Sequence, residues 1–225
     1  MEQQETGVHV DAKEYKIKIA NHWCTMNGIS GTPKKEIIHF IEKYLAKKKK
    51  KVIQIADPKG SSYGKLANQI IVNHHIQVSA FTEALLYLTC SKEIFDKVDW
   101  NKKQVVISKG SFLETFGYQN QLADWPVADA KDCLFLFMKH INNTFPGLSI
   151  VLTENYESAV KRAGKNFEYK GKKAKYLKDS DRFLHIKANP ILQALGIKIV
   201  NIEVNGRDPW EVFQKEIKPY LKCLE

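Results

Sequence analysis

The chain has 225 residues, of which 44% are hydrophobic and 27% charged, a balance typical of a globular protein that buries a sizeable core. Its net charge of +10 favours anionic partners such as nucleotides or nucleic acid. The composition excludes collagen-like, disordered and disulfide-rich chains, and no apolar run is long enough for a transmembrane helix.

The basic residues are mostly of one kind. Only three of the 35 are arginines, so 32 are lysines; the arginines are Arg162, Arg182 and Arg207. Arginine forms bidentate contacts with phosphate, whereas lysine acts as a point charge. A site that clamps phosphates with several arginines therefore has few candidates here.

The cysteines and the N-terminus bear on the cellular compartment. The four cysteines form no C-x-x-C pair and lie far apart, at Cys24, Cys90, Cys133 and Cys223. This pattern predicts scattered core thiols in a reducing compartment rather than a zinc site or disulfides. Residues 1–14 are polar and lack the order of a signal peptide, which predicts a flexible N-terminal tail on a cytoplasmic protein.

Strand and helix patterns alternate along residues 15–225. The strand patterns are Tyr15–Thr25, Val52–Ala56, Gln104–Ser108, Leu148–Leu152 and Lys198–Val204. The helical patterns are Lys34–Lys47, Gly64–Val72, Ser79–Val98, Lys131–Asn143, a start at Glu157–Arg162, and Pro209–Leu221. This alternation predicts one three-layer α/β domain, in which helices flank a five-stranded parallel sheet.

Two segments are strongly basic. The run Lys47–Lys51 ends a predicted helix, where cations suit the helix dipole; a nuclear localisation signal or RNA-binding patch is the alternative. Residues 161–180 interleave lysines with the aromatic residues Phe167, Tyr169 and Tyr176. This segment is either a lid-like basic flap or a solvated loop and helix.

The loop after the first strand partly matches a phosphate-binding motif. Gly28 to Lys35 reads GISGTPKK, against the pattern G-x-x-x-x-G-K-[ST]. Pro33 replaces a glycine and has no N–H, and Lys35 replaces the hydroxyl that would bind Mg²⁺. The sequence therefore predicts a degenerate phosphate-binding loop, formed by Gly28, Gly31, Thr32, Lys34 and Lys35.

Six segments in chain order resemble the thymidylate kinase family. They are Asn27–Lys34, Ala56–Ile71, Phe81–Ser91, Val105–Gln119, Pro146–Arg162 and Asp208–Ile217, which are similar to the family's EGxDGxGK, REPGGTxxGxxIRxxL, AEALLFAADR, VVxDRYxxSSLAYQG, PDLxIxLxxxxExAxxR and SPEEVFxEI stretches. The resemblance implies a P-loop NTPase-like fold with thymidylate kinase topology. It also implies transfer of the γ-phosphoryl group from ATP to dTMP, and homodimers paired through helices that flank the sheet.

Several polar groups of the family's motifs are replaced. Beyond Pro33 and Lys35, the replacements are Ser30 for the carboxylate inside the loop, Ala56 and Ser91 for two arginines, and Lys109-Gly110 for the Asp-Arg pair. Loss of one such transition-state partner typically slows a reaction by ~10²–10³. Lys35 and Lys109 occupy the positions at which the resemblance implies Mg²⁺ contacts. Their ammonium groups are candidates to hold an anion without Mg²⁺.

Some positions keep the residue types of the family. The resemblance implies a dTMP-site role for Asp57, Tyr87, Lys109, Tyr118 and Gln119, and a lid role for Arg162 and Lys165. Tyr87 would stack on the base, with a core aromatic as the alternative. Gln119 would lie near the nucleoside, with an ordinary loop amide as the alternative.

Three functions follow from these observations. The first is a catalytically degenerate thymidylate-kinase-like protein that binds a nucleotide or anion and acts through a partner. The second is a divergent, active ATP:dTMP phosphotransferase, and the third is an RNA- or ribosome-binding module. No catalytic residue or metal site is assigned, ATP or another nucleotide is the candidate ligand, and no Mg²⁺ requirement is assigned. The expected partner is a second copy or a paralogue, not a membrane; the compartment is the cytoplasm, with the nucleus as the alternative.

Overall fold

The computed structural model describes residues 16–56, 60–69, 79–100, 102, 104–111, 114–115, 144–164 and 189–224. The predicted tail over residues 1–14 and the predicted helix Lys131–Asn143 lie outside these ranges, as does most of the basic segment 161–180. Within the described residues, no helix combines the length and the apolar composition needed to span a membrane.

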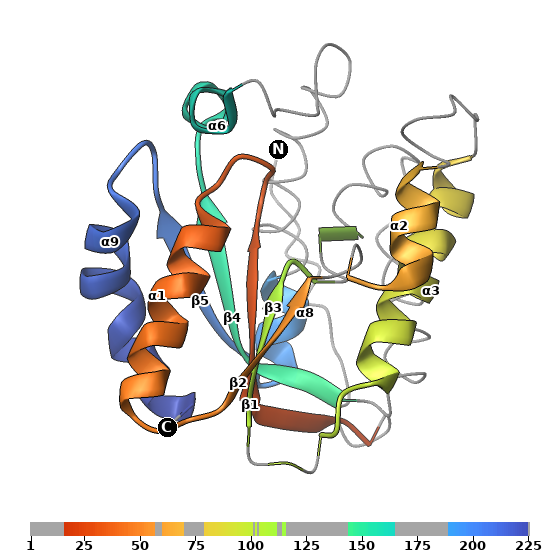
Figure 1. Ribbon diagram of the computed structural model, residues 1–225, viewed down its shortest axis with the longest axis horizontal. Coiled ribbons are helices and arrows are strands. Elements are labelled where there is room, and N and C mark those ends of the chain that lie inside the picture. Colours follow the sequence, from red (N-terminus) through yellow and green to blue (C-terminus); the bar gives the residue numbers. More distant parts are fainter. Residues whose placement is uncertain are drawn as a thin grey trace, which may run out of the picture.

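The described strands form one parallel sheet of five (Figure 1). They are β1 (Lys18–Gly28), β2 (Val52–Ala56), β3 (Val105–Lys109), β4 (Thr144–Thr153) and β5 (Lys198–Glu203), in the order β2-β3-β1-β4-β5. The predicted five-stranded parallel sheet is confirmed. β1 starts and ends three residues later than predicted, and its last residues, Met26 to Gly28, are buried and pair with β4.

Helices connect and cover the strands (Figure 1). They are α1 (Lys34–Lys47), α2 (Ser62–Asn68), α3 (Ala80–Asp96), α6 (Tyr156–Ala163), α8 (Asn189–Ala194) and α9 (Pro209–Val212). The predicted closing helix Pro209–Leu221 is confirmed as a helical segment, although it is not a regular α-helix throughout. α9 continues as a π-helical turn over Phe213–Ile217 and a 3₁₀ segment over Lys218–Leu224. Pro219 has no N–H to donate to the carbonyl of Lys215, so the α-helical hydrogen-bond pattern is interrupted at that point.

The two faces of the sheet bury different clusters. One cluster joins Cys24 and Met26 of β1 to α1 and the C-terminal segments. The other joins Trp23 of β1 to Phe95 of α3 and Leu192 of α8. Successive side chains of a strand point to opposite faces, so β1 contributes to both clusters. The result is the predicted three-layer arrangement.

The cysteines only partly match the prediction of core thiols. Cys24 and Cys90 are buried free thiols, whereas Cys223 is exposed; Cys133 lies outside the described residues. Burial raises the pKa of the Cys24 thiol well above its ordinary value. Cys24 is therefore an inert core side chain.

The backbone between β1 and α1 packs tightly. Gly28 and Gly31 have φ angles of 147° and 95°, which side-chain-bearing residues rarely adopt. A Cβ atom on Gly31 would lie 2.4 Å from the carbonyl oxygen of Ala159 in α6. The loop therefore lies directly beneath α6, and this contact fixes the distance between them.

We expect Gly31→Ala to lower the free energy of unfolding by more than ~2 kcal/mol, because it adds backbone strain and a clash with Ala159. Gly196→Ala is the matched control: Gly196 also has positive φ, at 79°, but its nearest neighbour would be 3.9 Å from the new Cβ. This control should lose only about 1 kcal/mol. Urea denaturation measures both, and equal losses would contradict the contact with α6.

Candidate functional site

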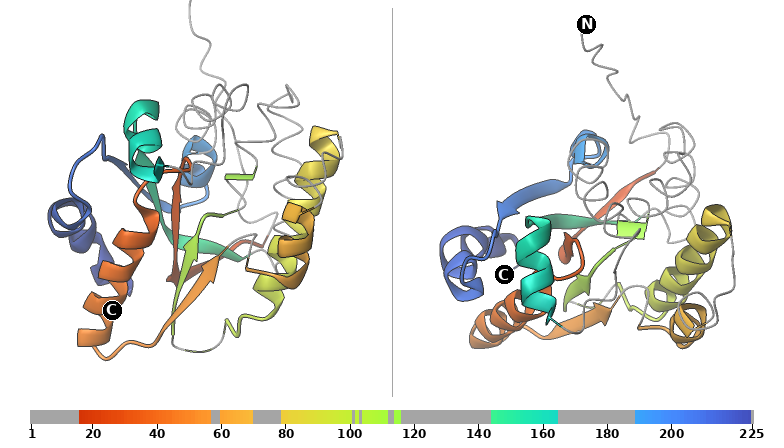
Figure 2. Two further views of the ribbon diagram at one scale, coloured as in Figure 1. Left: turned by 45° about the horizontal axis from the view of Figure 1, so that its top comes forward. Right: turned by 90° about the horizontal axis from the view of Figure 1, so that it is seen from above.

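The predicted loop lies at the carboxyl ends of β1, β3 and β4. β1 is the central strand, with β3 on one side and β4 on the other, and the chain leaves it through residues 29–33 into α1. Such a point in an open parallel sheet is a common place for ligands. Seen from above, α6 lies beside this loop (Figure 2, right).

The loop backbone is hydrogen-bonded to itself. The N–H of Lys34 donates to the carbonyl of Thr32 at 2.8 Å, around Pro33 with φ −78° and ψ 39°. This is an inverse γ-turn. The N–H of Thr32 donates to the carbonyl of Ile29 at 3.3 Å. Since Pro33 has no N–H, positions 32 to 34 present no unbonded backbone N–H to an anion.

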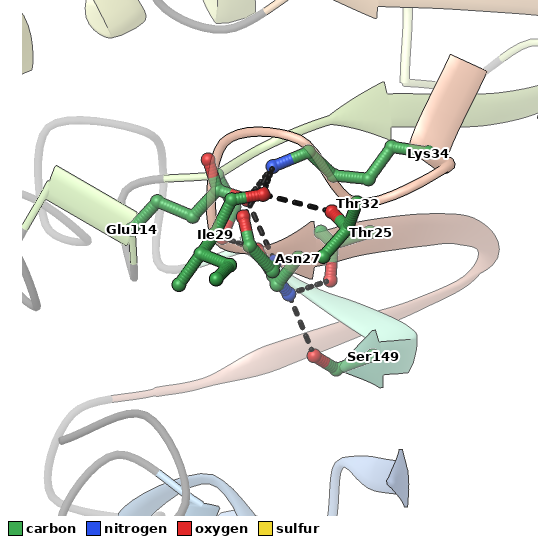
Figure 3. A network of polar contacts seen from close by, with 9 residues as sticks. Thr25, Asn27, Ile29, Thr32, Lys34, Glu114 and Ser149 are labelled. Atoms are coloured by element: carbon green, nitrogen blue, oxygen red, sulfur yellow. Dashed lines mark hydrogen bonds and ion pairs between the residues drawn. The ribbon is translucent and has the colours of Figure 1, made fainter. Parts of the chain in front are cut away.

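Lys34 is buried and is held by the chain itself (Figure 3). Its Nζ donates to the carbonyl of Gly28 and, at 3.4 Å, to that of Ile29. It also forms an ion pair with Oε1 of Glu114 at 2.9 Å. The same carboxylate oxygen accepts the N–H of Gly28 at 2.9 Å. One internal carboxylate therefore binds both the lysine and the first glycine of the loop.

A buried polar network holds the segment that carries Glu114. The side chain of Ser111 donates to Oδ1 of Asn27 at 2.6 Å, and the N–H of Glu114 donates to the carbonyl of Ser111 at 2.9 Å. Nδ2 of Asn27 donates to the hydroxyls of Thr25 and Ser149, both at 3.1 Å (Figure 3). The end of β1 is thereby joined to β4 and to the chain that follows β3.

The predicted site residues separate into three groups. The structure brings Gly28, Gly31, Thr32 and Lys34 together in the loop, with Lys35 exposed directly after it. Lys109 is exposed at the end of β3, opposite Met26, and Tyr87 is half-buried on α3. Asp57, Tyr118, Gln119 and Lys165 lie outside the described residues.

The residues present do not fit a Mg²⁺ ion held in the usual way by this loop. Mg²⁺ requires oxygen ligands, and the position of the ligating hydroxyl carries the ammonium group of Lys35. The nearby Glu114 carboxylate is already bound to Lys34. Among the residues that the structure describes, no group of three His, Cys, Asp or Glu side chains is close enough to hold a metal ion.

The two described arginines are paired with carboxylates of the chain. Nη2 of Arg162 lies 3.0 Å from Oε1 of the buried Glu154, which also accepts the N–H of Gly206 at 3.1 Å. Arg207 pairs with Glu216, and this hydrogen bond raises the pKa of Arg207. The predicted lid role of Arg162 stays a prediction, and in this structure its guanidinium joins α6 to the chain after β5.

The lysine run lies far from the loop. Lys47, Lys48, Lys49 and Lys51 are exposed at or beyond the C-terminal end of α1, whereas the loop precedes its N-terminal end (Figure 1). A 14-residue helix is about 21 Å long. The lysines therefore add no charge within contact distance of the loop, and the exposure fits a solvated helix end.

Sequence reasoning missed Glu114, Asn27, Ser111 and Glu154 as participants. Glu114 is separated from Lys34 by 80 residues, so no local spacing connects them. One signal was present: the charged Glu114 follows a buried parallel strand by five residues. Charged side chains in that position lie at the same edge of the sheet as the loop after β1.

Comparison with known proteins gives a consistent result. No family model matches the sequence. The thymidylate kinase of Mesoplasma florum is 25% identical over 211 residues, 90% of this chain and 96% of the relative. The thymidylate kinases of Thermosipho africanus and Nitrosomonas europaea are 28% and 31% identical over 76 residues, 34% of this chain and 38% and 35% of theirs.

The solved structure of thymidylate kinase from Candida albicans has the same fold. Its TM-score is 0.65 at 17% identity, covering 90% of this chain and 93% of that one. At this identity the likeness concerns the fold alone. Together with the sequence similarity, it confirms the predicted resemblance: the chain is similar in sequence to thymidylate kinases and has a thymidylate kinase fold.

Proposed function

We propose that the chain is a catalytically degenerate thymidylate-kinase-like protein, which binds the phosphate groups of a nucleotide or another anion and does not transfer a phosphoryl group at an ordinary kinase rate. The observation that carries this proposal is the turn at Pro33. It directs the N–H of Lys34 to Thr32, so part of the backbone cradle is withdrawn from a ligand.

The available charges also favour binding over transfer. Phosphoryl transfer depends on positioning and on cations that neutralise the charge of the transition state. Near this loop the described cations are Lys34, already paired with Glu114, and the exposed Lys35 and Lys109. An ammonium group can attract a phosphate, but it cannot replace the template geometry of a metal ion.

The alternative is a divergent, active dTMP kinase. It is favoured by the similarity to the Mesoplasma florum thymidylate kinase over 90% of the chain. This alternative requires ATP and dTMP as substrates and phosphate ligands from residues that the structure does not describe. Turnover and metal dependence separate the two functions.

We expect ATP to raise the melting temperature equally with Mg²⁺ and with EDTA, because Lys34, Lys35 and Lys109 would bind it without metal. Ligand at 100 times its Kd stabilises by ~2.7 kcal/mol, a shift of about 5–10 °C for a chain of this size. Lys34→Ala should abolish the shift, whereas Lys43→Ala, an exposed lysine further along α1, should not.

The same samples are assayed for ADP formation with ATP, dTMP and Mg²⁺, using the Mesoplasma florum enzyme as the positive control. We expect turnover to be lower by at least ~10³. A normal rate would establish the active kinase and overturn the proposal. The absence of a shift with any nucleotide would refute binding at this loop.

Restoring the motif gives a second prediction. The double variant Pro33→Gly, Lys35→Thr regains a glycine N–H and a hydroxyl at the positions where a phosphate-binding loop uses them. We expect stabilisation by ATP to become larger with Mg²⁺ than with EDTA. Lys43→Thr is the control for loss of a lysine on α1. If the double variant gained no metal dependence, Pro33 and Lys35 would not be the cause of the loss.

We also propose that two copies of the chain pair through α2 and α3. Five large apolar side chains are exposed among the described residues, and three of them lie on these neighbouring helices: Tyr63 (63%), Leu66 (53%) and Leu85 (44%). Helices that flank the sheet are also the surface implied by the family resemblance. A heterodimer with a related chain is the alternative.

We expect Leu66→Glu to reduce the mass in solution from that of two chains to that of one, because it places a charge in the apolar surface. Light scattering after gel filtration measures this mass. Ile19→Glu is the control, since Ile19 is also exposed but belongs to β1. A wild-type monomer at micromolar concentration would contradict the proposal.

A further inference from the structure

The carboxylate of Glu114 binds two donors of the loop, the N–H of Gly28 and Nζ of Lys34. We infer that Glu114 acts as an internal competitor for these donors, and that a nucleotide phosphate binds only by displacing it from Lys34 and Gly28. This inference rests on the proposed phosphate binding at the loop. It concerns a residue that motif comparison assigns no role.

The first argument is that one oxygen takes both donors. Oε1 of Glu114 lies 2.9 Å from the N–H nitrogen of Gly28 and 2.9 Å from Nζ of Lys34. A backbone N–H and an ammonium group that converge on one point are the donors that an anionic oxygen requires. A phosphate oxygen bound by the same two groups would occupy the same point as Oε1.

The second argument counts the hydrogen bonds of Lys34. An ammonium group has three donors. Those of Lys34 are directed to the carbonyl of Gly28, the carbonyl of Ile29 and the carboxylate of Glu114. The two carbonyls belong to the loop backbone and cannot be withdrawn without changing the loop. The donor directed to Glu114 is therefore the one that a ligand can take.

The third argument is that Glu114 competes with a phosphate for Lys34 and is not needed to orient Lys34. If Glu114 were needed to orient Lys34, its removal would weaken phosphate binding. Lys34 is, however, also held by the carbonyls of Gly28 and Ile29, and 10% of its side chain is exposed. Its orientation therefore persists without Glu114. Two anions cannot both lie within hydrogen-bond distance of the same donors without strong repulsion, so removal of the carboxylate strengthens binding.

The backbone near Glu114 is held in place, whereas its side chain can move. The N–H of Gly110 donates to the carbonyl of Met26 at 2.9 Å, and the hydroxyl of Ser111 donates to Oδ1 of Asn27. These bonds fix the backbone on the end of β1. The glutamate side chain has three rotatable bonds, so it can leave the loop while the backbone stays in place.

The test compares ATP and pyrophosphate binding by calorimetry in EDTA for wild type, Glu114→Gln and Glu114→Ala. We expect both variants to bind at least ~10-fold more tightly than wild type. Glu211→Gln is the matched control, because it also removes the carboxylate of a lysine pair, at 2.7 Å from Lys215. It should bind as wild type does. Equal or weaker binding by folded Glu114 variants would overturn the inference.

A second readout uses the unchanged chain. Glu114 is only 16% exposed in its pair with Lys34. If ATP displaces it, labelling of its carboxyl group by a carbodiimide and an amine rises when ATP binds, as read by peptide mass spectrometry. Unchanged or reduced labelling at saturating ATP would overturn the inference. If wild type binds but neither the tighter binding of the Glu114 variants nor the increased labelling is observed, only the inference fails. If no form binds ATP or pyrophosphate, the proposed function fails and the inference with it.

Discussion

The side-chain amide of Asn27 connects the parts of the molecule that form the candidate site. It is fully buried, donates to hydroxyls on β1 and β4, and accepts from Ser111 in the chain after β3. Leaving one polar atom of a buried amide without a partner costs free energy. The hydroxyls of Thr25, Ser149 and Ser111 are therefore held in place together by this one amide. Because the loop starts at the next residue and Glu114 follows Ser111, this one amide sets the geometry of both.

At this end of the sheet, three cationic side chains are paired with carboxylates of the same chain. Lys34 pairs with Glu114, Arg162 with Glu154, and Arg207 with Glu216. In a protein with a net charge of +10, such pairing removes charge where a phosphate-transferring site would concentrate it. This pairing supports the proposed function, in which the chain binds an anion and does not transfer a phosphoryl group.

Much of the fold was predictable from periodicity, because buried strands and amphipathic helices leave a local pattern. The bounds of α1 and β2 match the prediction residue for residue. The predicted closing helix is helical throughout, but its π-helical and 3₁₀ segments were not predicted. The missing N–H of Pro33 was also foreseeable. The position of Glu114 after a buried strand was a signal for this edge of the sheet, but its contacts with Gly28 and Lys34 were not predictable, because they join residues 86 and 80 positions apart.

The lysines near the loop differ in exposure, and exposed and buried lysines would affect different steps of anion binding. Lys35 and Lys109 are exposed, so their fields extend into solvent for about 10 Å at 0.1 M salt. Under the proposed function, they would set how often an anion encounters this edge of the sheet, and added salt would slow that encounter. Lys34 is buried and its charge is matched by Glu114, so it contributes little at a distance. Under the proposed function, the buried pair would instead set how long an anion stays bound.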